Sequence, residues 1–233
     1  MTASSTVGAP SAGGRRRTPL LGPMEARRAL YVDYEGSKDR PPTVLGYLMD
    51  RTLAAGIVEP LFAPCRKKHR AAHAALADHR QLLECLIDRA EREDRLVVSW
   101  SRHDLRLMEG ILQGDAPSLG ILGRRYRDAR LTARRWKNLR HPGLDESNTL
   151  DLYRQLLRLV VPERFGRGVV GKALATLRMQ LAERRGYGDL SNGAKAGWRA
   201  IVGHNRYDLE GMRAVCVAVA EELETHYQHS TAS

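Results

Sequence analysis

Apolar residues gather first in three short runs near the start of the chain. They occupy residues 28–35, 43–50 and 56–63, with the sequences RALYVDYE, TVLGYLMD and GIVEPLFA. The segment GSKDRPP between the first two runs is a turn signal, and such short connections favour antiparallel hairpins. We therefore expect three antiparallel strands in this part of the chain.

Helical periodicity dominates the remainder. Leucines and an isoleucine at helical spacing predict one long helix over residues 65–94. The run RLVVSW then predicts a buried strand, followed by a helix that begins near His103. Residues 148–152 fit either a fifth strand or the start of a helix, and the last helix is expected over residues 205–227. Strands that alternate with helices in this order indicate an α/β fold with a mixed sheet.

Length and cysteine content limit the class of protein. The chain has 233 residues, which suits one sizeable domain, and its 42% hydrophobic content is sufficient for a core. No apolar run approaches the roughly 18 residues of a membrane span, and no signal peptide is evident. The three cysteines are scattered and odd in number, which favours a reducing compartment. We therefore expect a cytoplasmic protein that does not enter a membrane.

The charge of the chain is strongly positive. The net charge is +11 and the isoelectric point is about 10.0. Residues 1–26 are rich in Ser, Gly, Ala and Pro around the sequence GRRR, which predicts a disordered basic tail before a domain at 27–228. The domain itself remains basic, so nucleic acid is the expected partner, with a solubility adaptation as the alternative. The sequence indicates no protein partner.

Carboxylates occur where apolar side chains are expected. Asp33 and Glu35 stand two apart in the first strand, so they face the same side and repel each other. Asp104 follows the fourth strand at the start of a helix. Asp208 lies four residues after His204, so the two share a helix face. A cation among these acids would relieve their repulsion.

The three motifs resemble those of a known superfamily. The order is D-x-E, then a strand followed by SRHD, then H-N-x-x-D in the last helix. It is similar to the ribonuclease H-like DEDD 3′–5′ exonucleases, and closest to their predicted nuclease branch, whose third motif is typically Y-N-x-x-D. The resemblance implies a ribonuclease H-like mixed sheet, in which three antiparallel strands precede parallel ones.

The resemblance also implies a site for two Mg²⁺ or Mn²⁺ ions. Asp33, Glu35 and Asp208 would hold the ion that activates water, with Asp33 bridging to a second ion supported by Asp104. Two cations roughly 4 Å apart can activate the nucleophile and stabilise the leaving oxygen of a phosphodiester, and both ions prefer carboxylate oxygens. His204 stands where the branch has Tyr and is the expected general base.

Each motif also has an ordinary structural explanation. Asn205 either braces the site or caps the last helix, with Asp208 as the acid of a capping box. Asp104 is also the kind of first-turn acid that a helix dipole favours. His204 would then be a half-buried ring without a catalytic role. The three motifs together, on a basic chain, favour the metal site.

A basic segment offers a surface for nucleic acid. Residues 124–140, RRYRDARLTARRWKNLR, hold eight basic residues and one acid. If this segment is one helix, its basic residues form a stripe that could follow a phosphate backbone, with Tyr126 or Trp136 as a stacking surface. The alternative is a solvated helix face with Trp136 in the core. The predicted binding residues are Arg124, Arg127, Arg130, Arg134 and Lys137.

The sequence thus predicts a metal-dependent 3′–5′ exonuclease. A second hypothesis keeps the fold and the nucleic-acid binding but has weak or no catalysis. A third is an interaction protein whose basic charge is incidental, which would show no salt-dependent binding to DNA or RNA.

Overall fold

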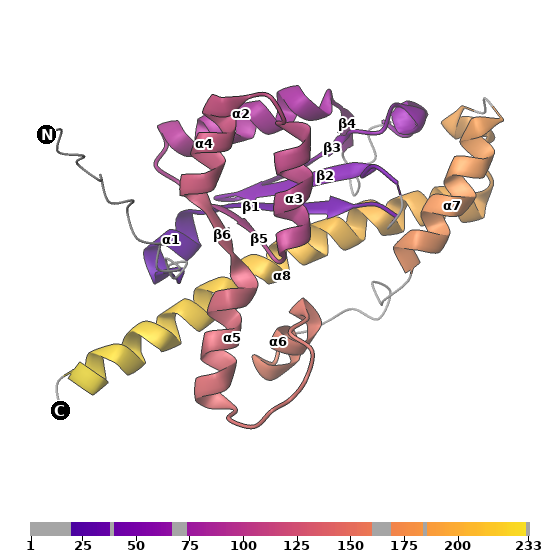
Figure 1. Cartoon of the computed structure of the whole chain (residues 1–233). Helices are drawn as coiled ribbons and strands as arrows, with labels where there is room; N and C mark the ends of the chain where they lie inside the picture. The colour runs from indigo at the N-terminus through magenta and orange to yellow at the C-terminus, as the bar shows by residue number, and fades with distance from the viewer. Residues whose placement is uncertain (1–19, 38–39, 67–73, 160–168, 184–185, 232–233) are drawn as a thin grey trace, which may run out of the picture.

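The computed structural model of the chain describes residues 20–37, 40–66, 74–159, 169–183 and 186–231 (Figure 1). In these residues a six-stranded mixed sheet has the order β4-β3-β2-β1-β5-β6. β1 pairs antiparallel with β2, and β2 with β3, whereas the β3–β4, β1–β5 and β5–β6 pairs are parallel. The strands are β1 (Leu30–Glu35), β2 (Val44–Met49), β3 (Thr52–Ile57), β4 (Ala74–Leu76), β5 (Val97–Ser99) and β6 (Tyr126–Asp128).

Helices cover both faces of the sheet (Figure 1). The helices are α1 (Pro23–Arg28), α2 (His79–Arg92), α3 (Arg102–Ile111), α4 (Ala116–Arg125), α5 (Ala129–Arg140), α6 (Leu150–Leu156), α7 (Val169–Ala182) and α8 (Asn192–Thr231). Within the described residues, Pro60–Cys65 and Tyr187–Asp189 form short 3-10 helices. The predicted α/β class and mixed sheet are confirmed, and the arrangement is compatible with a ribonuclease H-like fold.

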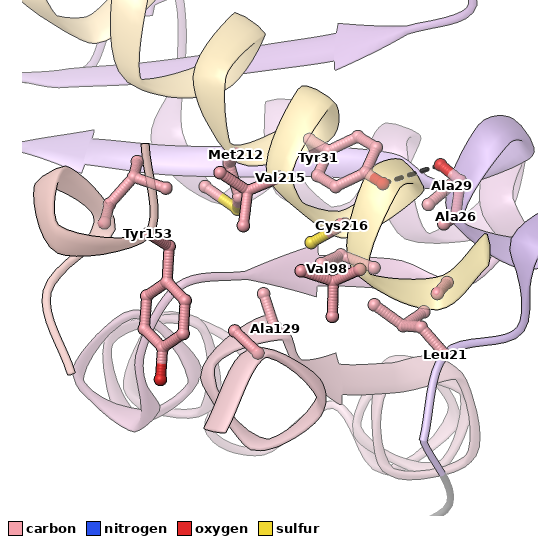
Figure 2. Close-up of a cluster of buried hydrophobic side chains, with 14 of the residues drawn as sticks. Leu21, Ala26, Ala29, Tyr31, Val98, Ala129, Tyr153, Met212, Val215 and Cys216 are labelled. Atoms are coloured by element: carbon pink, nitrogen blue, oxygen red, sulfur yellow. Dashed lines mark hydrogen bonds between the residues drawn. The ribbon is translucent and has the colours of Figure 1, made fainter. Parts of the chain in front are cut away.

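The alternation of side chains along β1 divides the core between the two faces. Leu30 and Val32 pack with α2, α3 and α4 on one face, and Tyr31 packs with α8 on the other. α8 has 40 residues, so it is about 60 Å long and runs beneath the sheet (Figure 1). In Figure 2 its Met212 and Cys216 lie among side chains of the sheet, of α1 and of α6.

Several predicted elements differ in the structure. The third strand lies at Thr52–Ile57 and overlaps only the first two residues of the predicted run, the later part of which forms a 3-10 helix. The helix predicted over 65–94 is confirmed only for residues 79–92, because Asp78 caps α2 and the short strand β4 precedes it. Residues 148–152 enter helix α6, and the additional strand is β6.

The predicted basic tail extends too far toward the core. Residues 1–19 lie outside the described part of the chain. Leu21 is buried, its backbone N–H donates to Thr132 Oγ1 at 3.1 Å, and Ala26 of α1 is also buried. The domain therefore includes at least residues 20–26. Among the described helices, none has the length and the apolar composition needed to cross a membrane.

Candidate metal centre

The first part of the site is the carboxyl-terminal end of β1. Tyr31, Asp33 and Glu35 alternate with apolar residues and face α8. Tyr31 joins the core, while the two acids further along meet polar side chains of α8. Because β1 lies between β2 and β5, these acids are central in the sheet. The strand thus places both carboxylates against the middle of one helix.

The residues of α8 that meet these acids are His204, Asn205 and Asp208. His204 Nδ1 lies 2.9 Å from Glu35 Oε1 and 3.5 Å from Asp208 Oδ2. Asn205 Nδ2 donates to the backbone oxygen of Asp33 at 3.0 Å and to its Oδ2 at 2.8 Å. The residues of the first and third motifs therefore come together as the sequence predicted.

The predicted start of the last helix is wrong. α8 begins at Asn192, so Asp208 lies well inside it and not in its first turn. Asn205 also lies inside α8, which excludes it as a helix cap; it is instead buried at 1% exposure and bonded to Asp33. The structural explanation of Asp208 as a capping acid is excluded for the same reason.

Asp104 reaches the same edge of the sheet from α3. β1 and β5 are parallel, so their carboxyl ends lie together, and α3 follows β5 directly. Ser101 caps α3, and its Oγ donates to Asp104 Oδ2 at 3.2 Å. Asp104 is a first-turn acid, as the structural alternative required, but it is also buried at 8% exposure.

The electrostatics of these acids indicate a negative cluster that the neighbouring cationic groups compensate only in part. Burial raises the pKa of Asp33 well above its ordinary value, and the charges of Glu35, Asp208 and Asp104 raise it further. Burial also raises the pKa of Glu35, although the hydrogen bond from His204 opposes this shift. Asp104 and Asp208 have raised pKa values mainly because of burial. Ionising all four acids together is therefore unfavourable without added positive charge.

His204 contributes to that positive charge in its protonated form. Burial alone would lower its pKa, but the hydrogen bond to Glu35 and the charges of Glu35 and Asp208 outweigh burial and raise it. A cavity of about 360 Å³ opens at this point, and its walls include Glu35, His204, Asp208, Asp151 and Gly171.

The chemistry of these side chains fits a divalent cation. One ligand atom from each of Glu35, His204 and Asp208 lies within 4.8 Å of the other two. Carboxylate oxygens are the ligands that Mg²⁺ and Mn²⁺ prefer, and a cation would relieve the repulsion that raises the pKa values. Asp33 and Asp104 lie outside this closest group, but their charges act on it.

Three residues near the site were not identified from the sequence. Arg154 of α6 is buried, and its Nη2 donates to Asp208 Oδ1 at 3.1 Å. Its Nη1 donates to Asp151 Oδ1 at 3.0 Å, and Asp151 lines the cavity. Gly46 of β2 pairs with Asp33 and leaves room for Asn205. A glycine inside a strand often marks such a close approach, which was the available signal for Gly46.

The predicted basic stripe does not exist as one helix. Arg124 lies in the last turn of α4 and pairs with Glu91, while Arg127 lies on β6 and donates to the backbone oxygens of Arg124 and Tyr126. Arg130 and Arg134 lie one turn apart on α5. The strand β6 interrupts the helical spacing on which the stripe depended.

Other members of the predicted surface are buried. Lys137 is 5% exposed, and its Nζ donates to the backbone oxygen of Glu146 at 3.0 Å. Tyr126 and Trp136 are also buried, so neither offers a stacking surface. Trp136 belongs to the core, as the structural alternative stated. Only Arg130 and Arg134 keep the predicted helical relationship on a partly exposed face.

Comparison of the chain with protein-family models, with curated proteins and with solved structures gives no match.

Proposed function

We propose that this protein is a metal-dependent nuclease, a 3′–5′ exonuclease that hydrolyses phosphodiester bonds with two Mg²⁺ or Mn²⁺ ions. The observation that supports the proposal most is the convergence of Asp33, Glu35, Asp104 and Asp208 at one edge of the sheet. Three separate elements supply these acids. Burial raises the pKa of all four, and repulsion from the other acids of the cluster adds to the shift at Asp33 and Glu35. A purely structural role does not explain four acids in one place, two of them buried and two partly buried.

The residues of the chain have distinct roles in this proposal. Glu35 and Asp208 hold a cation directly, while Asp33 and Asp104 complete the negative environment and support a second cation. Divalent cations held there would lower the cost of forming the nucleophile and of releasing the leaving oxygen. His204, fixed by Glu35 at 2.9 Å, is the base that takes the proton of the attacking water.

The basic charge of the chain supports nucleic acid as the substrate class. The net charge is +11, and α5, which carries Arg130 and Arg134, lies against α6, with the ring centroids of Trp136 and Tyr153 6.4 Å apart. α6 also carries Leu150 and Asp151 of the cavity wall. In the proposal, a phosphate backbone bound along α5 therefore passes close to the acids. Cys65, Cys85 and Cys216 are free, which fits a reducing compartment, and we place the enzyme in the cytoplasm.

A catalytically weak nucleic-acid-binding module is the second candidate. It is favoured by one observation, namely that the protein's own cationic groups already contact two of the acids. Arg154 bonds to Asp208, and His204 bonds to Glu35. Such contacts reduce the need for a metal ion.

The decisive experiment uses 5′-labelled single-stranded DNA and RNA with Mg²⁺, Mn²⁺ or EDTA. A ladder of products shortened from the 3′ end, abolished by EDTA, is the expected result. Asp33→Asn and Asp208→Asn should abolish cleavage and keep binding of the oligomer. Asp128→Asn is the matched control, because Asp128 is a buried acid at the end of β6 outside the cluster. Binding without cleavage by the unmodified protein would instead support the second candidate.

A further inference from the structure

Arg154 is a cation enclosed beneath the acidic cluster. Its side chain is 2% exposed, and its guanidinium joins α6 to α8. Nη2 donates to Asp208 Oδ1 at 3.1 Å and to the backbone oxygen of Tyr207 at 2.8 Å, and Nη1 donates to Asp151 Oδ1 at 3.0 Å. A group so enclosed cannot contact a substrate, so any role in the site must act through the acids that it holds.

Neighbouring residues of α8 pack around the Arg154 guanidinium and restrict its position. It lies over the ring of Tyr207, 4.2 Å from the ring centroid. On another side stands Gly211, where an added Cβ would lie 2.2 Å from Arg154 Nε. Gly211 is thus the residue of α8 that admits the arginine. The same helix carries Asp208, so the arginine and the carboxylate keep a fixed relationship.

The two oxygens of Asp208 have different surroundings. Oδ1 accepts from Arg154, whereas Oδ2 lies 3.5 Å from His204 Nδ1, on the side of Glu35. We propose that Arg154 is a positioning residue that occupies Oδ1 and makes Asp208 a one-oxygen ligand of the bound cation. This inference rests on the proposed function, because it assumes that the cluster binds a divalent cation.

The consequence is a preference between cations. Mg²⁺ is small and requires near-octahedral geometry, which a carboxylate binding through one oxygen suits. Ca²⁺ is larger, accepts six to eight oxygens and readily binds both oxygens of one carboxylate. By keeping Oδ1 occupied, Arg154 favours Mg²⁺ over Ca²⁺. Removing the arginine frees the second oxygen and shifts the preference toward Ca²⁺.

The experiment measures Mg²⁺ and Ca²⁺ affinity by calorimetry on the full chain. Arg154→Gln should shift the ratio of the two dissociation constants toward Ca²⁺ by on the order of tenfold, the usual effect of perturbing a residue that holds a metal ligand. Gly211→Ala keeps the arginine but displaces its guanidinium, so it should shift the ratio in the same direction. Arg154→Lys keeps the charge and should give a smaller shift.

Arg95→Gln is the matched control. Arg95 is a partly buried arginine, 11% exposed, with Nη1 and Nη2 each 2.8 Å from a carboxylate oxygen of Asp50 at the opposite end of β1. The Arg95→Gln variant should leave the ratio of the Mg²⁺ and Ca²⁺ dissociation constants unchanged. An unmodified protein that binds neither cation would overturn the proposed function. If the unmodified protein binds Mg²⁺, an unchanged ratio in Arg154→Gln and Gly211→Ala would overturn this inference alone. Equal loss of both cations from these variants would also overturn it.

Discussion

Asn205 of α8 occupies the space that a side chain on Gly46 of β2 would fill. A Cβ added to Gly46 would lie 1.7 Å from Asn205 Oδ1. Gly46 pairs with Asp33 across the sheet, and Asn205 donates to both the backbone and the carboxylate of Asp33. Because Gly46 of β2 has no side chain, Asn205 of α8 can hold Asp33 of the neighbouring strand β1 in place.

We predict that Gly46→Ala displaces Asn205 and releases the carboxylate of Asp33. The added methyl group overpacks a buried position, which typically costs about 1–3 kcal/mol of unfolding free energy. Cation affinity should also fall, because the carboxylate of Asp33 loses the hydrogen bond from Asn205 that orients it. Denaturant unfolding gives the first quantity, and calorimetry with Mn²⁺ gives the second.

Gly56→Ala is the control for this prediction. Gly56 lies on the neighbouring strand β3, where an added Cβ would meet Leu82 Cδ2 at 2.4 Å and no residue of the cluster. It should reduce stability without changing cation affinity. If Gly46→Ala and Gly56→Ala lower stability equally and both keep full affinity, Asn205 does not position Asp33.

The sequence predicted the strand acids correctly because their signal is local. Two carboxylates at i and i+2 in an apolar run share a face whatever the rest of the chain does. Asp104 was placed correctly for a related reason, since a strand followed at once by a helix puts the helix start at the edge of the sheet. The fold class followed from the same order of elements.

The elements that depend on distant contacts were missed. β6 has three residues, and it exists because it pairs with β5, which the basic run around it does not reveal. The early start of α8 was hidden by glycines that resemble helix breaks. Gly197 is tolerated there because α7 approaches closely, and an added Cβ would lie 3.1 Å from Ala173 Cβ. Arg154 reads as a surface residue until its acidic partners are placed around it.

A second prediction concerns Asp128, the acid at the end of β6. Its Oδ1 accepts from the backbone N–H of Arg130 as a helix cap, whereas its buried Oδ2 has no hydrogen-bond partner among the described residues. Arg130 Nη2 lies 3.7 Å from Oδ2, at the limit of an ion pair. Asp128→Asn keeps the cap and removes a buried charge, so it should stabilise the protein at pH 7 by up to about 1 kcal/mol.

The pH dependence of this gain follows from the direction of the pKa shift. Burial raises the pKa of Asp128 in the folded protein above the ordinary value of 3.8. The folded state therefore binds a proton more tightly than the unfolded state, and Asp128 costs stability as pH rises through its folded pKa. The advantage of Asp128→Asn should be largest at neutral pH and shrink toward pH 4. An equal advantage at both pH values in thermal unfolding would contradict this explanation.

A third prediction tests the part of the basic surface that the structure retains. Arg130 and Arg134 lie one turn apart on α5, and the side chain of Arg130 is 41% exposed. Replacing both with Gln should weaken binding of DNA and RNA equally across sequences. The slope of log affinity against log salt should become shallower by about 0.7–0.9 for each phosphate that the protein no longer neutralises.

Arg80 and Arg89 provide a control with the same change in charge. Both lie on α2, on the face of the sheet opposite α8, and each is 45% exposed. The double change to Gln there should leave the salt slope as it is. If both double variants flatten the slope equally, the net charge of the chain and not α5 determines binding.

The last prediction separates two roles for His204. As a base fixed by Glu35 through Nδ1, it should contribute on the order of 10²–10⁴ to the rate of cleavage. His204→Ala should lose this factor while Mn²⁺ affinity changes by less than about tenfold, because the carboxylates that bind the cation remain. Added imidazole should restore part of the rate, since the side chain is 22% exposed at the cavity. His226→Ala, on an exposed turn of the same helix, should change neither quantity. Parallel loss of rate and Mn²⁺ affinity in His204→Ala would make the ring a metal ligand, and an unchanged rate would leave it only a structural neighbour of Glu35.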